Sequence, residues 1–282
     1  MNIISNTEFG GERPLYFSQD LLLKNVTIHA GESAVKESRN IRAEDCRFEG
    51  KYVFWENDGV ECDHCSFAPS ARSSIWYSRH ILLRHCQVDA PKMFRRAQFI
   101  ELKHTDLPNA EETFWDCSHI RLEDVQVSNA DYLFMHSEDI NIRNYHQDGN
   151  YSFQLAKHVE IHNAVINSKD SFWESEDCTL VDCRINGEYL GWYSRNLRLV
   201  RCHISGTQPL CYCHNLVLED CTFGDDADLA FEYSTVNATI KGRIESIKNP
   251  TSGHITVDEV GEVIIDKNQQ QPADCRISVL HQ

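Results

Sequence analysis

A repeat of 19 to 20 residues runs through most of this sequence and constrains its fold more than any other feature. Each copy opens with apolar residues at its first, third, sixth and eighth positions, as in IRAEDCRF, ILLRHCQV and LVLEDCTF. The regular copies begin at Ile41, Val60, Ile81, Ile100, Ile120, Ile140, Val159, Cys178, Leu197, Leu216 and Val236. Less regular copies begin at Leu21 and Ile255. Of the ten steps between regular starts, six are 19 residues long, three are 20 and one is 21.

The repeated unit predicts short β-strands, because apolar and polar residues alternate and no copy carries a continuous helical stripe. A unit of this length without a helix is typical of one coil of a parallel β-helix, which rises by one strand spacing of about 4.8 Å. We therefore predict an all-β, single-domain solenoid of about 11–13 coils with 19–20 residues per coil. Residues 1–19 are expected to form an N-terminal cap, residues 20–235 the coils, and residues 236–282 final coils and a C-terminal cap.

Stacking of the coils assigns residues to columns. Half of the twelve cysteines occupy the sixth position, which predicts an interior ladder of small apolar thiols: Cys46, Cys65, Cys86, Cys183, Cys202 and Cys221. The position before each restart holds residue types that tolerate a left-handed backbone, which predicts a ladder of tight turns: Asn40, Gly59, His80, His119, Asp139, His158, Asp177, Asn196 and Asn215.

Two other interpretations of these residues are weaker. The segments CRFEG, CSFAP and CQVDA resemble the unit of a pentapeptide-repeat helix, but 19-residue steps do not divide by five. Cys62 and Cys65 stand near His64, which stacks with His85 and His104 at the fifth position, and Cys-x-x-Cys with a histidine is found in zinc sites. Both cysteines fall on inward positions and His64 on an outward one. We therefore predict no metal site and no cofactor.

A second pattern surrounds the recurring Phe-Trp-acid sequence at 54–56, 114–116 and 172–174. Counting back about five residues from each turn gives a mostly apolar column, expected in the core: Val35, Phe54, Ile75, Phe94, Phe114, Leu133, Phe153, Phe172, Gly191 and Leu210. The next column contains all five tryptophans: Lys36, Trp55, Trp76, Arg95, Trp115, Phe134, Gln154, Trp173, Trp192 and Cys211. The column after it mixes aromatic and charged residues: Glu37, Glu56, Tyr77, Arg96, Asp116, Met135, Leu155, Glu174, Tyr193 and Tyr212.

We predict that the tryptophan column faces outward. Strand parity alone also permits the reverse, with the tryptophans buried and the phenylalanines outside. Arg95 and Gln154 lie in the tryptophan column, however, and burying an unpaired arginine is very costly. Facing outward, the two columns form a ridge of aromatic rings edged by charged groups. Residues two positions before the core column would flank it: Lys92, Glu112, Asp131, Tyr151, Asp170 and Tyr189.

Composition limits the partners. The formal net charge is -16 at pH 7, which repels phosphates and anionic lipids, so we expect neither a nucleic acid nor a membrane partner. No apolar run approaches the roughly 18 to 20 residues that cross a bilayer. The N-terminus lacks the features of a secretory signal, and twelve cysteines without such a signal are typical of reduced thiols. We therefore expect a cytoplasmic protein, whose oligomeric state stays open.

The coil pattern resembles the right-handed parallel β-helix of the pectin-lyase-like superfamily. The segments GERPLYF, GESAVKESRNI, ETFWD, GEYLGWYSRNL and SGHITVDEV are similar to those of a bacterial family of about this length that carries a domain-of-unknown-function label. The resemblance covers essentially the whole chain and implies a right-handed β-helix, but it brings no catalytic residues. Superfamily members include polysaccharide lyases and hydrolases. The calcium-binding Asp cluster and basic residue typical of pectate lyases have no clear counterpart in this sequence.

Two functions fit the expected ridge, and whether the protein is an enzyme stays open. One is a carbohydrate-active hydrolase or lyase that takes its acid and base from Glu37, Glu56, Arg96 and Asp116. Glu37 and Glu56 would stack about 5 Å apart, near the carboxylate separation of a retaining glycosidase. The other is a non-catalytic solenoid that binds a glycan or a protein. An oligosaccharide would contact the ridge residues Trp55, Trp76, Tyr77, Arg95, Trp115, Trp173, Glu174, Trp192 and Tyr193.

Overall fold

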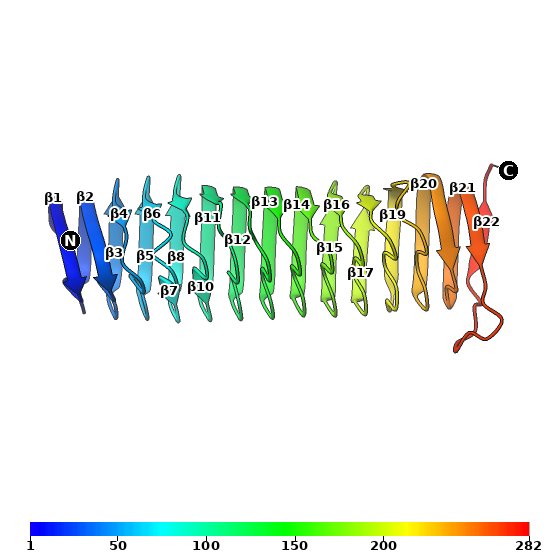
Figure 1. The fold of residues 1–282 in the computed structure, drawn as a ribbon, viewed down its shortest axis with the longest axis horizontal. Helices are drawn as coiled ribbons and strands as arrows, with labels where there is room; N and C mark the ends of the chain where they lie inside the picture. The colour runs from blue at the N-terminus through cyan, green and yellow to red at the C-terminus, as the bar shows by residue number, and fades with distance from the viewer. Residues whose placement is uncertain (282) are drawn as a thin grey trace. The chain divides into compact units, whose positions relative to one another are not determined.

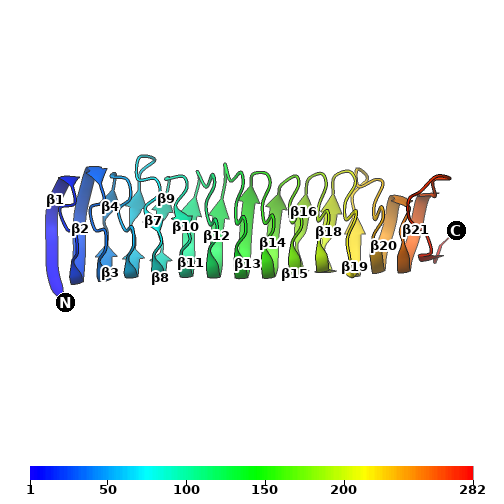
Figure 2. The same cartoon turned by 90° about the horizontal axis from the view of Figure 1, so that it is seen from below.

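The computed structural model describes residues 1–281, which form the strands and turns of about 15 coils. None of these residues belongs to a helix long and apolar enough to span a bilayer. The chain divides into two compact units, Met1–Asp148 and Gly149–Gln282. Each unit is a parallel β-solenoid in which strands of successive coils lie side by side (Figures 1 and 2).

In the first unit every coil pairs with the next one through parallel strands. The repeat starts lie opposite one another, because Ile41 pairs with Val60, Val60 with Ile81, and Ile81 with Ile100. The register deduced from the repeat is therefore confirmed. The strands are β1 Asn2–Glu12, β2 Gln19–Glu32, β3 Arg39–Glu44, β4 Arg47–Phe48, β5 Asp58–Asp63, β6 Ser66–Phe67, β7 Ile75–Trp76, β8 Arg79–Arg84, β9 Gln87–Val88, β10 Phe94–Arg95, β11 Gln98–Leu107, β12 Ser118–Val127 and β13 Glu138–Asp148.

The second unit repeats the arrangement. Cys178 pairs with Leu197, and the last coils pair through β20, β21 and β22. Its strands are β14 Lys157–Asn167, β15 Glu176–Val181, β16 Arg184–Asn186, β17 Arg195–Val200, β18 His203–Ser205, β19 Leu216–Phe223, β20 Thr235–Lys248, β21 Ser252–Ile264 and β22 Arg276–Val279. The expected caps at residues 1–19 and 236–282 stay a prediction. Both segments contain strands, since β1 lies within residues 1–19 and β21 and β22 lie within residues 236–282.

Residues with a left-handed backbone change the direction of the chain at fixed positions of each coil. At the fifth position of one coil, Asp45 has a φ of 54°, which turns both Glu44 and Asp45 outward and leaves Ala43 and Cys46 buried. This explains why the inward positions are one, three, six and eight instead of strictly alternate. The predicted turn ladder is confirmed, since φ is positive at all of its members: Asn40, Gly59, His80, His119, Asp139, His158, Asp177, Asn196 and Asn215.

Aromatic and thiol side chains fill the core in the predicted columns. Phe94 and Phe114 are fully buried, with their ring centroids 4.7 Å apart and their planes 7° from parallel. The six cysteines at the sixth position are buried, and all twelve cysteines are free thiols. The core ladders predicted from the sequence are therefore present.

One coil was assigned wrongly by one residue. Leu133 is buried, as expected, but Phe134, which was expected to face outward, is also fully buried and stacks on Phe114 at 4.7 Å, so Phe134 takes the place in the core column. Met135 takes the half-exposed place of a tryptophan, and His136 follows with a φ of 56°. Leu133 lies six residues before the turn residue Asp139, whereas Phe134 lies five before it, as Phe114 lies five before His119, so each column of this coil moves by one residue.

Candidate functional site

The tryptophan column faces outward, as predicted. Trp115 is half-exposed, whereas Phe114 before it is fully buried and Asp116 after it is exposed. The backbone is what places two successive side chains, Trp115 and Asp116, on the outside. In each coil from Glu37 to Tyr212, the residue directly after the tryptophan column has a left-handed φ, for example 53° at Asp116. Cys211 is the exception in the tryptophan column, since it is buried.

In the first unit the rings of the tryptophan column cover one another. The ring centroids of Trp55 and Trp76 lie 5.2 Å apart. The guanidinium of Arg95 lies 4.4 Å from the ring centroid of Trp76 and 4.6 Å from that of Trp115, an arrangement that stabilises the cation. Arg95 also pairs with Glu112 at 3.3 Å. The faces that were expected to receive sugars are thus largely occupied by neighbouring side chains.

The second unit has a shorter ladder of the same kind. The ring centroids of Trp173 and Trp192 lie 5.5 Å apart, and those of Tyr193 and Tyr212 lie 4.8 Å apart with planes 13° from parallel. The indole nitrogen of Trp173 donates a hydrogen bond to Glu174 at 3.2 Å. Here too neighbouring aromatic rings cover part of one another, although Tyr193 stays 44 % exposed.

A surface depression of about 510 Å³ lies beside this corner in the first unit. Along its wall run four residues that occupy the left-handed column in successive coils, namely Phe17, Glu37, Glu56 and Tyr77. Phe17 and Tyr77 are 63 % and 42 % exposed and stand at the two ends of the row. Three coil spacings separate them, on the order of 14 Å, which is longer than one pyranose ring. We call this feature the Phe17–Tyr77 depression.

The two carboxylates in the wall share one cation. Lys36 Nζ lies 3.3 Å from Glu37 Oε1 and 3.4 Å from Glu56 Oε2. The hydroxyl of Tyr16 donates a hydrogen bond to Glu37 Oε2 at 2.7 Å. This hydrogen bond, assisted by Lys36, lowers the pKa of Glu37. Glu37 is therefore held as a carboxylate that accepts hydrogen bonds.

Arginines and a third carboxylate complete the Phe17–Tyr77 depression. Asp58 accepts a hydrogen bond from Arg79 Nη2 at 2.8 Å and contacts His80 Nδ1 at 2.7 Å. Within the described residues, the side chain of Arg39 makes no ion pair. Asn57 is only 2 % exposed, and its Nδ2 has no hydrogen-bond partner among the described residues. The depression thus offers acceptors on Glu37, Glu56 and Asp58 and donors on two guanidiniums.

The four residues predicted to be catalytic fall into two pairs. Glu37 and Glu56 line the depression, whereas Arg96 and Asp116 lie further along the column and face each other at 3.9 Å. Asp116 also contacts His136 at 3.4 Å. Three coil spacings, about 14 Å, separate Glu56 from Asp116, so the four cannot act on one bond.

Sequence reasoning missed Phe17, Arg39, Asp58 and Arg79. Phe17 lies three residues before Asp20, as Glu37 lies three before Asn40, so extending the columns by one coil finds it. The other three occupy the position directly before a turn residue. That column mixes charges of both signs, and no pattern in it distinguishes a binding residue from a solvated one.

A protein-family model matches almost the whole chain. The model of a family described as "Protein of unknown function (DUF3737)" matches residues 2–278. No curated protein sequence matches the chain.

Several solved structures are similar to this chain at low sequence identity. The surface adhesin PfbA of Streptococcus pneumoniae is 10 % identical, with a TM-score of 0.41, over 84 % of this chain and 70 % of its own. A tailspike protein of E. coli bacteriophage HK620, in complex with a hexasaccharide, is 11 % identical with a TM-score of 0.47, over 92 % of this chain and 61 % of its own. The A-module of the Azotobacter vinelandii mannuronan C-5 epimerase AlgE4 is 10 % identical with a TM-score of 0.28, over 98 % and 91 %.

Proposed function

The chain belongs to the DUF3737 family of proteins of unknown function, and we propose that it is a non-catalytic solenoid that binds a neutral oligosaccharide in the Phe17–Tyr77 depression. The observation that carries the proposal is the row of two exposed aromatic rings with two carboxylates between them. An aromatic face packs against the C–H face of a pyranose, while carboxylates and guanidiniums hydrogen-bond its hydroxyl groups.

The charges favour a neutral ligand. Glu37, Glu56 and Asp58 contribute three negative charges, and Arg39, Arg79 and the neighbouring Lys36 contribute three positive ones, so the site has no net charge. The formal charge of -16 on the whole chain disfavours a polyanionic glycan. A neutral sugar is not repelled by the negative chain and needs no net charge in the site. The depression still offers hydrogen-bond donors and acceptors to its hydroxyl groups.

The same contacts argue for binding over hydrolysis. A glycosidase needs one carboxylic acid whose pKa is raised, so that it can protonate the leaving group. The pKa of Glu37 is lowered instead, and Lys36 contacts both carboxylates. Glu37 and Glu56 lie in adjacent coils, and this short distance between two carboxylates is the one feature that favours a retaining glycosidase. Analysis of the reaction products tests that alternative.

A glycan array probed with labelled protein tests the proposal. We expect the wild type to select neutral oligosaccharides and the variants Phe17→Ala and Tyr77→Ala to lose them. Tyr193→Ala is the matched control, because it removes a ring of the second unit that is 44 % exposed. If only Tyr193→Ala lost binding, the glycan would bind at the aromatic stack of the second unit, and the proposal would be contradicted.

Incubation of each bound glycan with the protein, followed by mass spectrometry of the products, tests the absence of catalysis. We expect the glycans to remain intact. Cleavage that disappears in Glu37→Gln and in Glu56→Gln would show that the two carboxylates work as a catalytic pair.

A further inference from the structure

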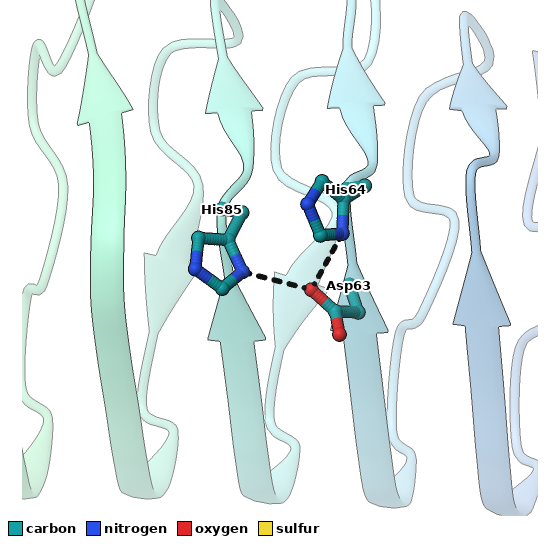
Figure 3. A group of neighbouring side chains, drawn as sticks. All are labelled: Asp63, His64 and His85. Carbon is teal, nitrogen blue, oxygen red and sulfur yellow. Dashed lines mark hydrogen bonds and ion pairs between the residues drawn. The ribbon is translucent and has the colours of Figure 1, made fainter.

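Three polar side chains gather on the outer surface of the first unit, away from the Phe17–Tyr77 depression. Asp63 ends β5, His64 follows it, and His85 follows the end of β8 in the next coil (Figure 3). Both histidines occupy the fifth position of their coils, with φ values of 52° and 49°, and both are exposed. The left-handed backbone at this position is what turns the two imidazoles outward.

The two imidazoles converge on one carboxylate oxygen. Nδ1 of His64 lies 3.0 Å and Nδ1 of His85 lies 3.1 Å from Oδ1 of Asp63 (Figure 3). The ligand atoms of the three residues all lie within 4.8 Å of one another. The rings themselves stack with centroids 4.7 Å apart and planes 19° from parallel. Small rotations about exposed side-chain bonds would bring the three atoms around one ion.

Other histidine–carboxylate pairs of the described residues differ from this group. His119 contacts Asp139 at 3.1 Å, but it brings one imidazole to one carboxylate. His29 uses its two nitrogens for two separate carboxylates, Glu8 and Glu49, and one ring cannot point both nitrogens at the same ion. Among the described residues, the Asp63 group is the one whose ligand atoms lie close enough to share a metal.

We propose that Asp63, His64 and His85 bind a divalent transition-metal ion of the zinc, nickel or copper class. Imidazole nitrogen suits these ions, and three protein ligands leave positions for water or for a further ligand. The site does not involve the nearby thiols, since Cys62 and Cys65 are buried in the core. It therefore differs from the Cys-x-x-Cys site that the sequence argued against.

Neighbouring charges set the conditions for binding. Arg84 Nη2 lies 3.8 Å from Asp63 Oδ2 and is the cation that a metal would have to displace or tolerate. Arg84 also pairs with Glu61, so a second carboxylate is available to it. His104 stacks on His85 at 5.2 Å and contacts Asp124 at 3.3 Å, which places a third imidazole beside the site.

Calorimetric titration of metal-free protein with ZnCl₂ at neutral pH tests the proposal. Cys275, the one cysteine that is not fully buried, is replaced by serine throughout to remove a competing thiol. We expect one bound zinc ion per chain. The variants His64→Asn and His85→Asn should weaken binding at least tenfold, while His119→Ala should leave it unchanged. Asparagine is chosen because Asn144 and Asn163 occupy the same column with left-handed φ values.

Cobalt replacing zinc gives a second readout, because thiolate ligands produce an intense near-ultraviolet charge-transfer band that imidazole and carboxylate do not. We expect visible bands without that charge transfer. The proposal is overturned if zinc does not bind, if His64→Asn and His85→Asn bind it as the parent does, or if the thiolate band is present.

Discussion

The indole nitrogen of Trp115 donates a hydrogen bond to the backbone oxygen of Tyr132 in the following coil, 2.5 Å away. Trp76 and Trp192 make the equivalent bond to Lys92 and Gln208, both at 2.7 Å. The indole nitrogens of these outward tryptophans therefore link successive coils by hydrogen bonds, while the indole rings contact neighbouring side chains of their column. This double use explains a tryptophan column without a ligand, whereas Phe17 and Tyr77 stay 63 % and 42 % exposed. Tyr77 also contacts Trp55, with ring centroids 5.3 Å apart, and the Arg96 guanidinium lies 5.9 Å from its ring centroid.

Neighbouring residues at the corner should differ in their contribution to stability. Phe114→Ala opens a cavity between Phe94 and Phe134, each 4.7 Å away by ring centroid, and should cost about 3–5 kcal/mol. Trp115→Ala should cost clearly less, because its side chain is half-exposed. Urea unfolding of both variants measures the difference. Equal losses would mean that the indole is as much a part of the core as the phenyl ring.

The turn ladder should depend on left-handed conformations. Gly59 has a φ of 82°, and an added Cβ would meet only the backbone of Asn40 at 3.4 Å, so conformation and not space limits substitution. Gly59→Ala should cost about 1–2 kcal/mol of unfolding free energy. Gly59→Asn should cost less, since asparagine tolerates this region. As a control, Gly10→Ala replaces a glycine whose Cβ would meet nothing closer than 3.8 Å. It should be nearly neutral, and a loss equal to that of Gly59→Ala would refute the conformational explanation.

Thiol reactivity should report the interior ladder. Eleven cysteines are buried and Cys275 is half-buried, and burial raises the pKa of Cys275 to about 11. With an aromatic disulfide reagent at neutral pH, we expect one slowly reacting thiol in the folded protein and twelve after denaturation. Cys275→Ser should abolish the native reaction. Rapid reaction of several thiols would contradict the packed core.

Acid should weaken the ion pair at the edge of the depression. Hydrogen bonds from Arg79 and then His80 lower the pKa of Asp58 below its ordinary value. A lowered carboxyl pKa contributes stability that is complete above the unfolded pKa, about 3.9, and is lost as pH falls through the folded one. The stability difference between wild type and Arg79→Gln should therefore shrink between pH 5 and pH 2. Arg72→Gln, whose exposed side chain makes no ion pair within the described chain, is the control. A difference that does not change with pH would contradict the pairing.

The repeat predicted the fold because the same short pattern of apolar and polar residues recurs in every coil. One IRAEDCRF segment fits several folds, but the same alternation at nearly constant steps fits few besides a solenoid. The columns of Cys46 and Phe114 followed directly, and so did the outward face of Trp115. Leu133 was misassigned because it lies six residues before the turn at Asp139, whereas Phe134 lies at the five-residue spacing that the other coils share.

The site was harder to predict than the fold. The sequence placed Glu37 and Glu56 on adjacent coils but could not show that Lys36 lies between them. Nor could it show that neighbouring side chains cover most of the faces of Trp76 and Trp115. These facts depend on side-chain rotamers, which the spacing of residues along a chain does not determine.

Calorimetric titration with the glycan selected on the array tests the central claim most directly, using wild type, Tyr77→Phe and Tyr77→Ala. Phenylalanine keeps the ring face and alanine removes it. The account predicts that Tyr77→Phe binds within a few-fold of wild type and that Tyr77→Ala binds at least tenfold more weakly, a loss of about 1.4 kcal/mol or more. Equal affinity in all three proteins would show that the Phe17–Tyr77 depression is not where the oligosaccharide binds.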